Sequence, residues 1–192
     1  NTSVKFRAYP HHPDYLATQP DATLSGRVLE PIPFDARGLG ASFTHLRPPL
    51  PEFLLFGAMM VDRIDIKHLM GAVRSVESAA HVARLLGRYC VDRLCWGRGT
   101  RLVMGNALVG RLYHSLLQRN VRVWLSSEVT SMTQADGRVT GVVLQREGQT
   151  VEVHARAGVV LATGGISHHP TLRRSLMPES LGVPSTVVSS AT

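Results

Sequence analysis

Two adjacent glycines, Gly164 and Gly165, follow an apolar run at 159–162 and could form part of a nucleotide-binding edge. Glycine has no side chain, so a chain that turns at glycine lets a dinucleotide approach the backbone closely. In open α/β sheets, ligands bind beyond the carboxyl ends of the strands, where this pair would lie if the apolar run is a strand. A glycine pair after a strand is by itself more often a turn, so the surrounding elements must decide between the two interpretations.

Histidines near both ends of the chain suggest a metal site, but their surroundings argue against one. His168 and His169 are adjacent, and no Cys, Asp or further His stands beside them at a metal-ligand spacing. The group of His11, His12 and Asp14 is interpreted in the same way. We therefore predict loop histidines and no metal.

The two cysteines, Cys90 and Cys95, are too few for a disulfide framework. A spacing of five residues would turn them to different faces of a helix. We predict reduced, buried side chains without a redox or metal role.

The first half of the chain divides into an irregular and a helical part. Proline and glycine interrupt residues 1 to about 60 every few positions, which predicts extended turns and short helices that cover another part of the protein. From Asp62 or Asp65, either of them a plausible N-cap, apolar residues recur every three or four positions as far as Leu94. This spacing predicts a long amphipathic helix or two consecutive ones.

A further helix is expected after the sequence GRGT at 97–100, with Thr100 as its cap. Its predicted apolar face consists of Leu102, Val109, Leu112, Leu116 and Leu117.

After this helix, the spacing of the apolar residues changes from that of a helix to that of strands. Residues 121–125 predict a short strand, and 128–163 predict three strands joined at Asp136-Gly137 and Glu147-Gly148, followed by a fourth. The last strand, at 159–162, lacks polar alternation and should be buried on both faces, as in a parallel sheet.

Charge and hydropathy exclude two classes of partner. The net charge of +7 comes almost wholly from arginines spread along the chain, and aromatic residues are only 6%. A nucleic-acid binder normally concentrates its positive charge on one face, so we predict no nucleic acid partner. No apolar run approaches the ~20 residues that span a bilayer, and no signal peptide is visible, so we expect no membrane span and a cytoplasmic location.

Three segments together resemble the FAD-dependent oxidoreductases of the fumarate reductase and succinate dehydrogenase flavoprotein superfamily, especially its 3-ketosteroid dehydrogenase-like branch. They are GRGTRLVMGNALVGRLYHSLLQRNVRVWLSSEVTSM, ADGRVTGVVL and ARAGVVLATGG. Further upstream, HHPDY, GRVLEPIPFDARGLG and RPPLPE resemble the family's segment that covers the flavin. The resemblance implies an α/β fold, part of a Rossmann-like FAD-binding domain with an antiparallel β-meander and flanking helices.

The resemblance also divides the chain into three regions. Residues 1–96 would be the proline-rich covering segment with the long helix or helix pair, and 97–165 the central part of the FAD-binding domain. Residues 166–192 would begin a substrate, or cap, segment that is truncated.

The same resemblance implies the residues that contact FAD. Val129 would meet the adenine through its backbone amide and carbonyl, although without the resemblance it reads as an ordinary strand valine. Ala162 and Thr163 would line the nucleotide beside Gly164 and Gly165.

Tyr15, in the sequence PDY, resembles a tyrosine that the steroid-dehydrogenase branch places near the flavin. A phenol there could assist proton transfer. We prefer a tyrosine that packs a loop, and Tyr15 is not among the predicted site residues.

One expected segment is missing from the sequence. A flavin domain of this kind holds the pyrophosphate with a strand, a Gly-x-Gly-x-x-Gly turn and a helix, whereas Gly38 and Gly40 lie in a proline-rich loop. The end of the chain, Ser190-Ala191-Thr192, resembles the beginning of a turn found further along in the family. We therefore expect an internal piece of a longer flavoprotein, with FAD bound by the complete parent and not by this chain alone.

The parent would transfer a hydride between FAD and a carbon next to a carbonyl or carboxylate of a ketosteroid or a di- or tricarboxylate. The sequence names no catalytic residue. Expected partners are the missing N- and C-terminal parts of the same polypeptide, a small-molecule substrate, and a second copy bound through exposed apolar faces. The alternative function is a non-enzymatic basic binding or assembly module that has lost the cofactor.

Overall fold

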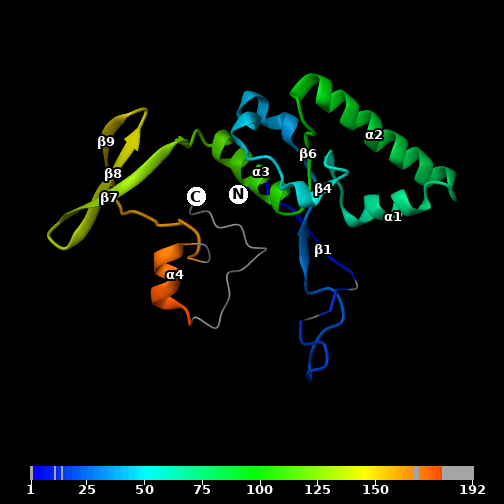
Figure 1. Ribbon diagram of the computed structural model, residues 1–192, viewed down its shortest axis with the longest axis horizontal. Helices are drawn as coiled ribbons and strands as arrows, with labels where there is room; N and C mark the ends of the chain where they lie inside the picture. Colours follow the sequence, from blue (N-terminus) through cyan, green and yellow to red (C-terminus); the bar gives the residue numbers. More distant parts are fainter. Residues whose placement is uncertain (1, 11, 14, 167–168, 179–192) are drawn as a thin grey trace. The chain divides into compact units, whose positions relative to one another are not determined.

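The computed structural model describes residues 2–10, 12–13, 15–166 and 169–178 of the 192-residue chain (Figure 1). The chain forms two compact units, a first unit of Asn1–Val123 and a second unit of Trp124–Thr192. This division concerns packing alone, and the functional regions expected at 1–96, 97–165 and 166–192 stay predictions.

The first unit combines three helices with short strands and 3₁₀ turns. The antiparallel strand pairs are β1 (Phe6–Ala8) with β2 (Leu29–Pro31), β3 (Phe34–Asp35) with β6 (Arg101–Leu102), and β4 (Leu54–Leu55) with β5 (Met59–Met60). The 3₁₀ turns are η1 (Ala36–His45) and η2 (Pro51–Phe53), and the helices are α1 (Arg63–Gly71), α2 (Val76–Trp96) and α3 (Met104–Gln118). The prediction of turns and short helices before residue 60 is confirmed.

Two consecutive helices, α1 and α2, confirm the prediction from the apolar spacing. Asp62 caps α1: its side chain accepts hydrogen bonds from the backbone N–H groups of Ile64 and Asp65, and the Asp65 side chain accepts from the Asp62 N–H. Gly97 ends α2 in the left-handed conformation, with φ of 73°. The start of α1 and the end of α2 are therefore each determined by a local capping residue.

The start of α3 differs from the prediction. Thr100 does not cap it; the backbone N–H and the hydroxyl of Thr100 both donate to Asp92 Oδ2 at 2.8 Å, and the N-cap is Val103. The reason is that residues 101 and 102 pair with β3 as a strand, so the helix begins only after them.

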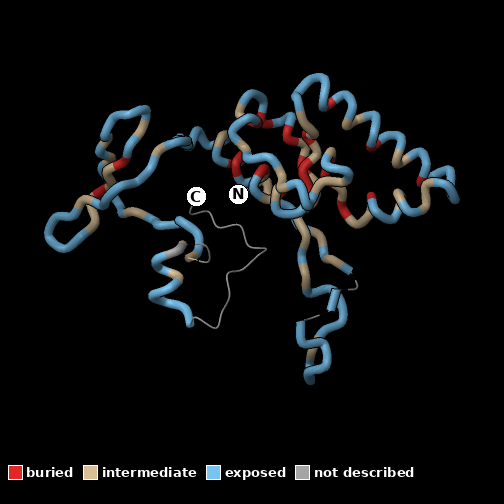
Figure 2. Tube along the Cα trace, in the orientation of Figure 1, coloured by how far each residue is buried: buried red, intermediate tan, exposed pale blue. Residues whose placement is uncertain are grey.

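The core lies where η1, β3 and β6 pack on α3, and its buried residues are Phe34, Ala36, Leu39, Phe43, Met60, Leu102, Val103, Ala107 and Tyr113 (Figure 2). The predicted apolar face of α3 is largely wrong, because Val109, Leu112 and Leu116 are exposed. Of the other two predicted residues, Leu102 is buried in the core but belongs to β6, and Leu117 packs against the core. Small residues on another face, among them Ala107 and Gly110, let α3 approach Phe34 instead.

Gly110 makes this close approach possible, and a larger side chain there should destabilise the protein. A Cβ atom at position 110 would lie 2.7 Å from Phe34 Cδ1 and 3.1 Å from Leu102 Cδ1. Gly110→Val should lower the free energy of unfolding by about 1–3 kcal/mol, as measured by urea denaturation. Gly87→Ala is the matched control: no atom lies within 4 Å of its Cβ, and it should raise stability by about 0.5–1 kcal/mol. Equal effects of the two changes would contradict this packing.

The second unit contains the predicted meander. β7 (Ser127–Ala135), β8 (Arg138–Arg146) and β9 (Gln149–His154) form an antiparallel sheet in the order β7-β8-β9, followed by the short helix α4 (Pro170–Leu176). Both turns have two residues with positive φ, 50° and 73° at Asp136-Gly137 and 51° and 75° at Glu147-Gly148. These values match the hairpin turns that such dipeptides favour, so the turn prediction is confirmed.

Two predicted strands are not formed. Residues 121–125 and 159–162 form no strand and have no strand partner among the described residues, and Val160 and Leu161 are 91% and 62% exposed. The expectation of a strand buried on both faces is therefore wrong for this chain, because a strand needs neighbours that satisfy its backbone hydrogen bonds.

The prediction that both cysteines are buried is also wrong. Cys90 and Cys95 are free thiols and both are exposed on α2.

Candidate functional site

The segment 162–165 follows the meander along the chain and is exposed (Figure 2). Gly164 has φ of 82°, in the left-handed region that glycine adopts without strain. Gly164 and Gly165 are both exposed, but the chain forms no turn at either of them. Contact of this segment with a nucleotide stays a prediction.

Val129 lies on β7, which is an outer strand of the three-stranded sheet. The register shifts between Val129 and Ser131, a bulge at which Thr130 Oγ1 donates to the carbonyl of Val143 at 3.2 Å. The Val129 side chain is 52% exposed. Bulges on outer strands redirect the backbone and are frequent beside ligand sites. The geometry is compatible with a backbone contact at Val129, which stays a prediction.

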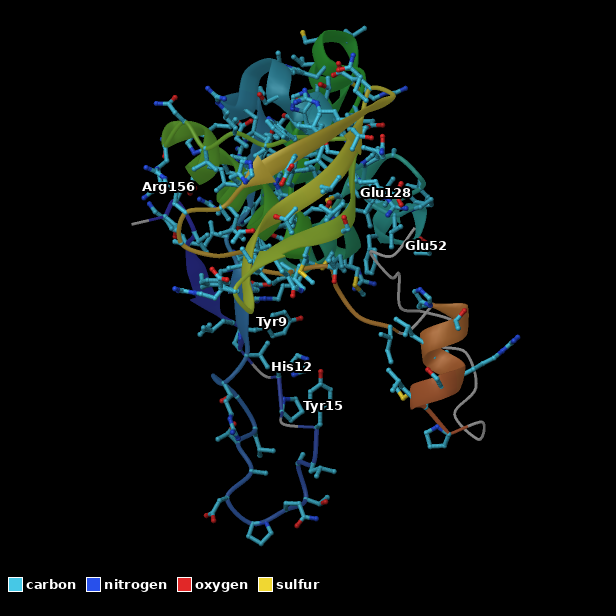
Figure 3. All side chains as sticks on the ribbon, turned by 90° about the vertical axis from the view of Figure 1, so that its left-hand side faces the viewer. Tyr9, His12, Tyr15, Glu52, Glu128 and Arg156 are labelled. Atoms are coloured by element: carbon cyan, nitrogen blue, oxygen red, sulfur yellow. The ribbon has the colours of Figure 1, made fainter. Side chains whose placement is uncertain are left out.

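The N-terminal segment carries Tyr15 away from the helices. Figure 3 shows Tyr9, His12 and Tyr15 following one another along this extension. The Tyr15 side chain is fully exposed, and the rings of Tyr9 and His12 meet edge to face at 5.4 Å. The structure therefore gives Tyr15 no loop to pack against within this unit. His11 and Asp14 lie outside the described residues.

His169 has a structural role. Its Nδ1 accepts a hydrogen bond from the backbone N–H of Leu172 at 3.2 Å, and it caps the N-terminus of α4. His168 lies outside the described residues, as does the end of the chain at 190–192. Across the part of the chain that the structure describes, no group of three or more His, Cys, Asp or Glu side chains could hold a metal ion.

A buried charge network, which the sequence did not reveal, joins four segments of the first unit. Asp62 is 6% exposed, and its Oδ2 lies 3.2 Å from Nη2 of Arg7 and 3.2 Å from Nη2 of Arg101. Asp65 is 1% exposed, and its Oδ2 lies 2.7 Å from Nη1 of Arg101. Glu30 pairs with Arg7 and extends the network to β2. Strands β1, β2 and β6 are thereby tied to the start of α1.

The electrostatics of this network favour the ionised carboxylate of Asp62. Burial alone would raise the pKa of Asp62, but the backbone hydrogen bonds from Asp65 and Ile64 and the charges of Arg101 and Arg7 lower it below its usual value. The sequence showed Asp62 and Asp65 only as possible helix caps, because partners 39 and 55 residues away leave no local pattern.

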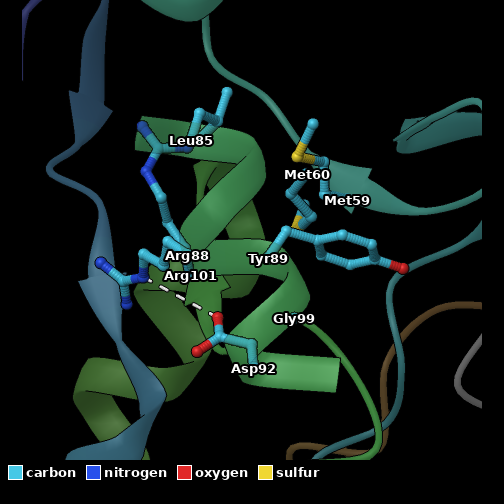
Figure 4. A pocket seen from close by; sticks show the side chains of 8 residues that line it. All are labelled: Met59, Met60, Leu85, Arg88, Tyr89, Asp92, Gly99 and Arg101. Atoms are coloured by element: carbon cyan, nitrogen blue, oxygen red, sulfur yellow. Dashed lines mark ion pairs between the residues drawn. The ribbon is translucent and has the colours of Figure 1, made fainter. Parts of the chain in front are cut away.

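Two cavities adjoin the network. One is lined by Met59, Met60, Leu85, Arg88, Tyr89, Asp92, Gly99 and Arg101 (Figure 4). Its volume of about 10 Å³ is enough for a water molecule at most, since a water needs roughly 10–15 Å³. The second measures about 360 Å³, and its lining includes Leu29, Ile66 and Met104 together with the charged Glu30 and Arg63. This second cavity has the size of a small-molecule pocket, about 300–1,000 Å³.

Comparisons with known proteins agree with the sequence pattern. A family model described as FAD binding domain matches residues 7–192. The chain is 36% identical over 179 residues to 4-oxocyclohex-2-ene-1-carboxylate 5-dehydrogenase of Sinomonas cyclohexanicum, covering 92% of the chain and 30% of that protein. It is 29% identical over 175 residues to 3-oxosteroid 1-dehydrogenase of Comamonas testosteroni, covering 88% of the chain and 30% of that protein.

A solved structure shows the same fold. The crystal structure of 3-ketosteroid delta1-dehydrogenase from Sterolibacterium denitrificans, in complex with 1,4-androstadiene-3,17-dione, matches with a TM-score of 0.78 and 34% sequence identity. The match covers 95% of this chain and 34% of that one. The chain thus spans about 30% of the length of the curated relatives it matches. No helix among the described residues is long and apolar enough to cross a membrane.

Proposed function

Since the chain belongs to the FAD binding domain family, we propose that the complete polypeptide that carries it is an FAD-dependent dehydrogenase of cyclic ketones. The carrying observation is the meander of β7, β8 and β9 followed by an exposed segment in which Gly164 has a positive φ, in a chain matched by that family over residues 7–192. The resemblance to the flavoprotein superfamily is confirmed by the match, and so is the mixed α/β fold with its antiparallel meander.

The proposed cofactor contacts are Val129, Ala162, Thr163, Gly164 and Gly165. The absence of a side chain at the glycine pair and the bulge next to Val129 both expose backbone atoms, which is what a dinucleotide requires at close range. FAD, when bound, accepts a hydride from the substrate. The chain's own contribution would be to hold the nucleotide through these backbone groups.

The proposed substrate class rests on the names of the similar proteins. A 4-oxocyclohexene carboxylate and a 3-oxosteroid share a six-membered ring with a ketone. Dehydrogenation of such a ring removes a hydride from one carbon and a proton from its neighbour, leaving a C=C bond. A carbonyl beside the carbon that loses the proton makes that proton acidic, so a protein base can remove it. We therefore propose a ring ketone rather than a di- or tricarboxylate.

The internal use of the arginines speaks against the alternative, a basic binding module. Arg7, Arg63 and Arg101 pair with buried or half-buried carboxylates, and Arg37 and Arg88 pair with Asp35. These five arginines hold parts of the fold together, so their side chains are already paired and are not set aside for an acidic partner. A cytoplasmic location stays a prediction from the sequence.

Purified complete polypeptide should be yellow and should lose its visible flavin absorbance when a cyclic ketone is added without oxygen. The experiment compares three compounds as substrates: a saturated 3-oxosteroid, 4-oxocyclohexane carboxylate and succinate. Product formation is monitored as a decrease in mass by two hydrogens. Bleaching by a ring ketone and not by succinate is expected. A colourless polypeptide would support the non-enzymatic module, and bleaching by succinate alone would exclude the ketone class.

A further inference from the structure

The apolar residues whose spacing predicted α2 lie mainly on its exposed side (Figure 2). The residues that recur along the helix at alternating intervals of four and three are all exposed, and they form the outward face of α2: Val76, Ala80, Ala83, Gly87, Cys90 and Leu94. Val76 and Leu94, at the two ends of this face, are each 87% exposed. A single exposed apolar residue is ordinary, whereas a continuous exposed stripe of them marks an interaction surface.

The opposite face of α2 is the one that packs within the first unit. Its buried residues, Ser78, Leu85 and Asp92, recur every seven positions. Half-buried Val82 and Tyr89 lie beside them and add to the apolar part of this contact. Seven residues are nearly two helical turns, so the buried residues form one stripe, on the side of the helix away from the outward face. The fold of the first unit therefore leaves the outward face uncovered.

The spacing and size of the outward residues suit another helix. Alternating intervals of four and three residues form the seam along which helices pair in coiled coils. The middle of the seam carries small residues, Ala80, Ala83 and Gly87, which let a second helix approach closely. Helices that lie on a lipid surface present large apolar side chains instead, so the observations favour a helix as the partner.

Two charges beside the seam complement each other in a symmetric pair. Glu77 and Arg84 are both exposed and stand one position after Val76 and Ala83, on the same border of the outward face. Neither takes part in an ion pair among the residues that the structure describes. In an antiparallel pair with Ala80 of one copy beside Ala83 of the other, each Glu77 lies next to the Arg84 of the second copy. A two-fold axis makes this favourable contact twice.

We propose that the outward face of α2 is a homodimer interface, on which α2 of a second copy packs antiparallel with Ala80 and Ala83 at the centre and a Glu77–Arg84 pair on each side. A parallel pair would place Arg84 beside Ala79 of the second copy and leave both charges without an opposite one. One pair of helices about 30 Å long is a small interface, so the dimer should be weak, with a Kd of about 1–100 μM.

Sedimentation velocity of the complete polypeptide at about 1–200 μM tests the interface. The wild type should shift from monomer to dimer with concentration. Ala83→Glu places a charge in the middle of the seam and should weaken association about tenfold or more. Alanine and glutamate both favour helices, so circular dichroism should show an unchanged fold. Ala135→Glu makes the same change at an exposed position of β7 and should dimerise like the wild type.

Exchange of the two charges tests the antiparallel register. Glu77→Arg alone, or Arg84→Glu alone, replaces two attractive contacts by two repulsive ones and should weaken the dimer about tenfold. The double variant restores opposite charges and should return to within about twofold of the wild type. A wild type that stays monomeric, because the rest of the polypeptide or a lipid surface covers α2, would overturn the proposal. So would a dimer that Ala83→Glu leaves intact, or a double variant no stronger than the single ones.

Discussion

Asp62→Ala is expected to lower the free energy of unfolding by about 3 kcal/mol, because it leaves two partly buried arginines with one carboxylate partner fewer each. The Asp62 side chain accepts two backbone hydrogen bonds and pairs with Arg7 and Arg101. Removing one member of a buried ion pair typically costs about 3–5 kcal/mol. We expect the lower end of that range, because Arg7 still pairs with Glu30 and Arg101 with Asp65.

Asp35→Ala is the matched control for this change. Asp35 also caps a helical turn, η1, and pairs with Arg37, but its side chain is 40% exposed. Loss of this exposed cap and pair should cost only about 1 kcal/mol. Chemical denaturation monitored by circular dichroism measures both variants, and equal losses would contradict a special role for burial at Asp62.

The same site determines how stability depends on acid. The pKa of Asp62 is lowered in the folded protein, so its contribution is complete above the unfolded pKa and is lost as pH falls through the folded pKa. The loss should therefore occur below about pH 4. The denaturation curves of Asp62→Asn should show a smaller loss of stability in this range than those of the wild type.

The predictable parts of the fold are those whose causes are local in sequence. Asp136-Gly137 and Glu147-Gly148 dictate tight hairpin turns by themselves, and the apolar spacing after Asp62 dictates the helices. The start of α3 was mispredicted because a strand pair between residues 34 and 102 takes precedence over a possible cap at Thr100. Pairing across such a distance has no signature in the local sequence.

The candidate site shows the same division between local and distant causes. The positive φ at Gly164 agrees with a local cause, because glycine is the residue that adopts positive φ without strain. The predicted contact of Val129 with the adenine came from the resemblance alone, since a valine in a strand does not by itself indicate a ligand site. The buried network of Asp62, Asp65 and Arg101 was missed because its members come from different segments, and each alone resembles an ordinary surface charge.

Gly164→Ala should weaken FAD binding by the complete polypeptide about tenfold, which corresponds to about 1.4 kcal/mol. A Cβ atom at φ of 82° costs about 1–2 kcal/mol, so the conformation with this positive φ becomes less populated. If the nucleotide binds only that conformation, the apparent affinity falls by the same factor. Titration of the apoprotein with FAD, followed by flavin fluorescence, measures the change.

Gly148→Ala separates a cofactor contact from simple backbone strain. Gly148 has φ of 75°, nearly that of Gly164, but lies in the turn between β8 and β9, away from the proposed nucleotide edge in sequence. Alanine there should cost similar stability and leave FAD affinity unchanged. If both variants lose affinity equally, the loss reflects the stability of the meander and not contact at Gly164. If neither does, the glycine pair is not a cofactor contact, and the nucleotide must be held by other parts of the polypeptide.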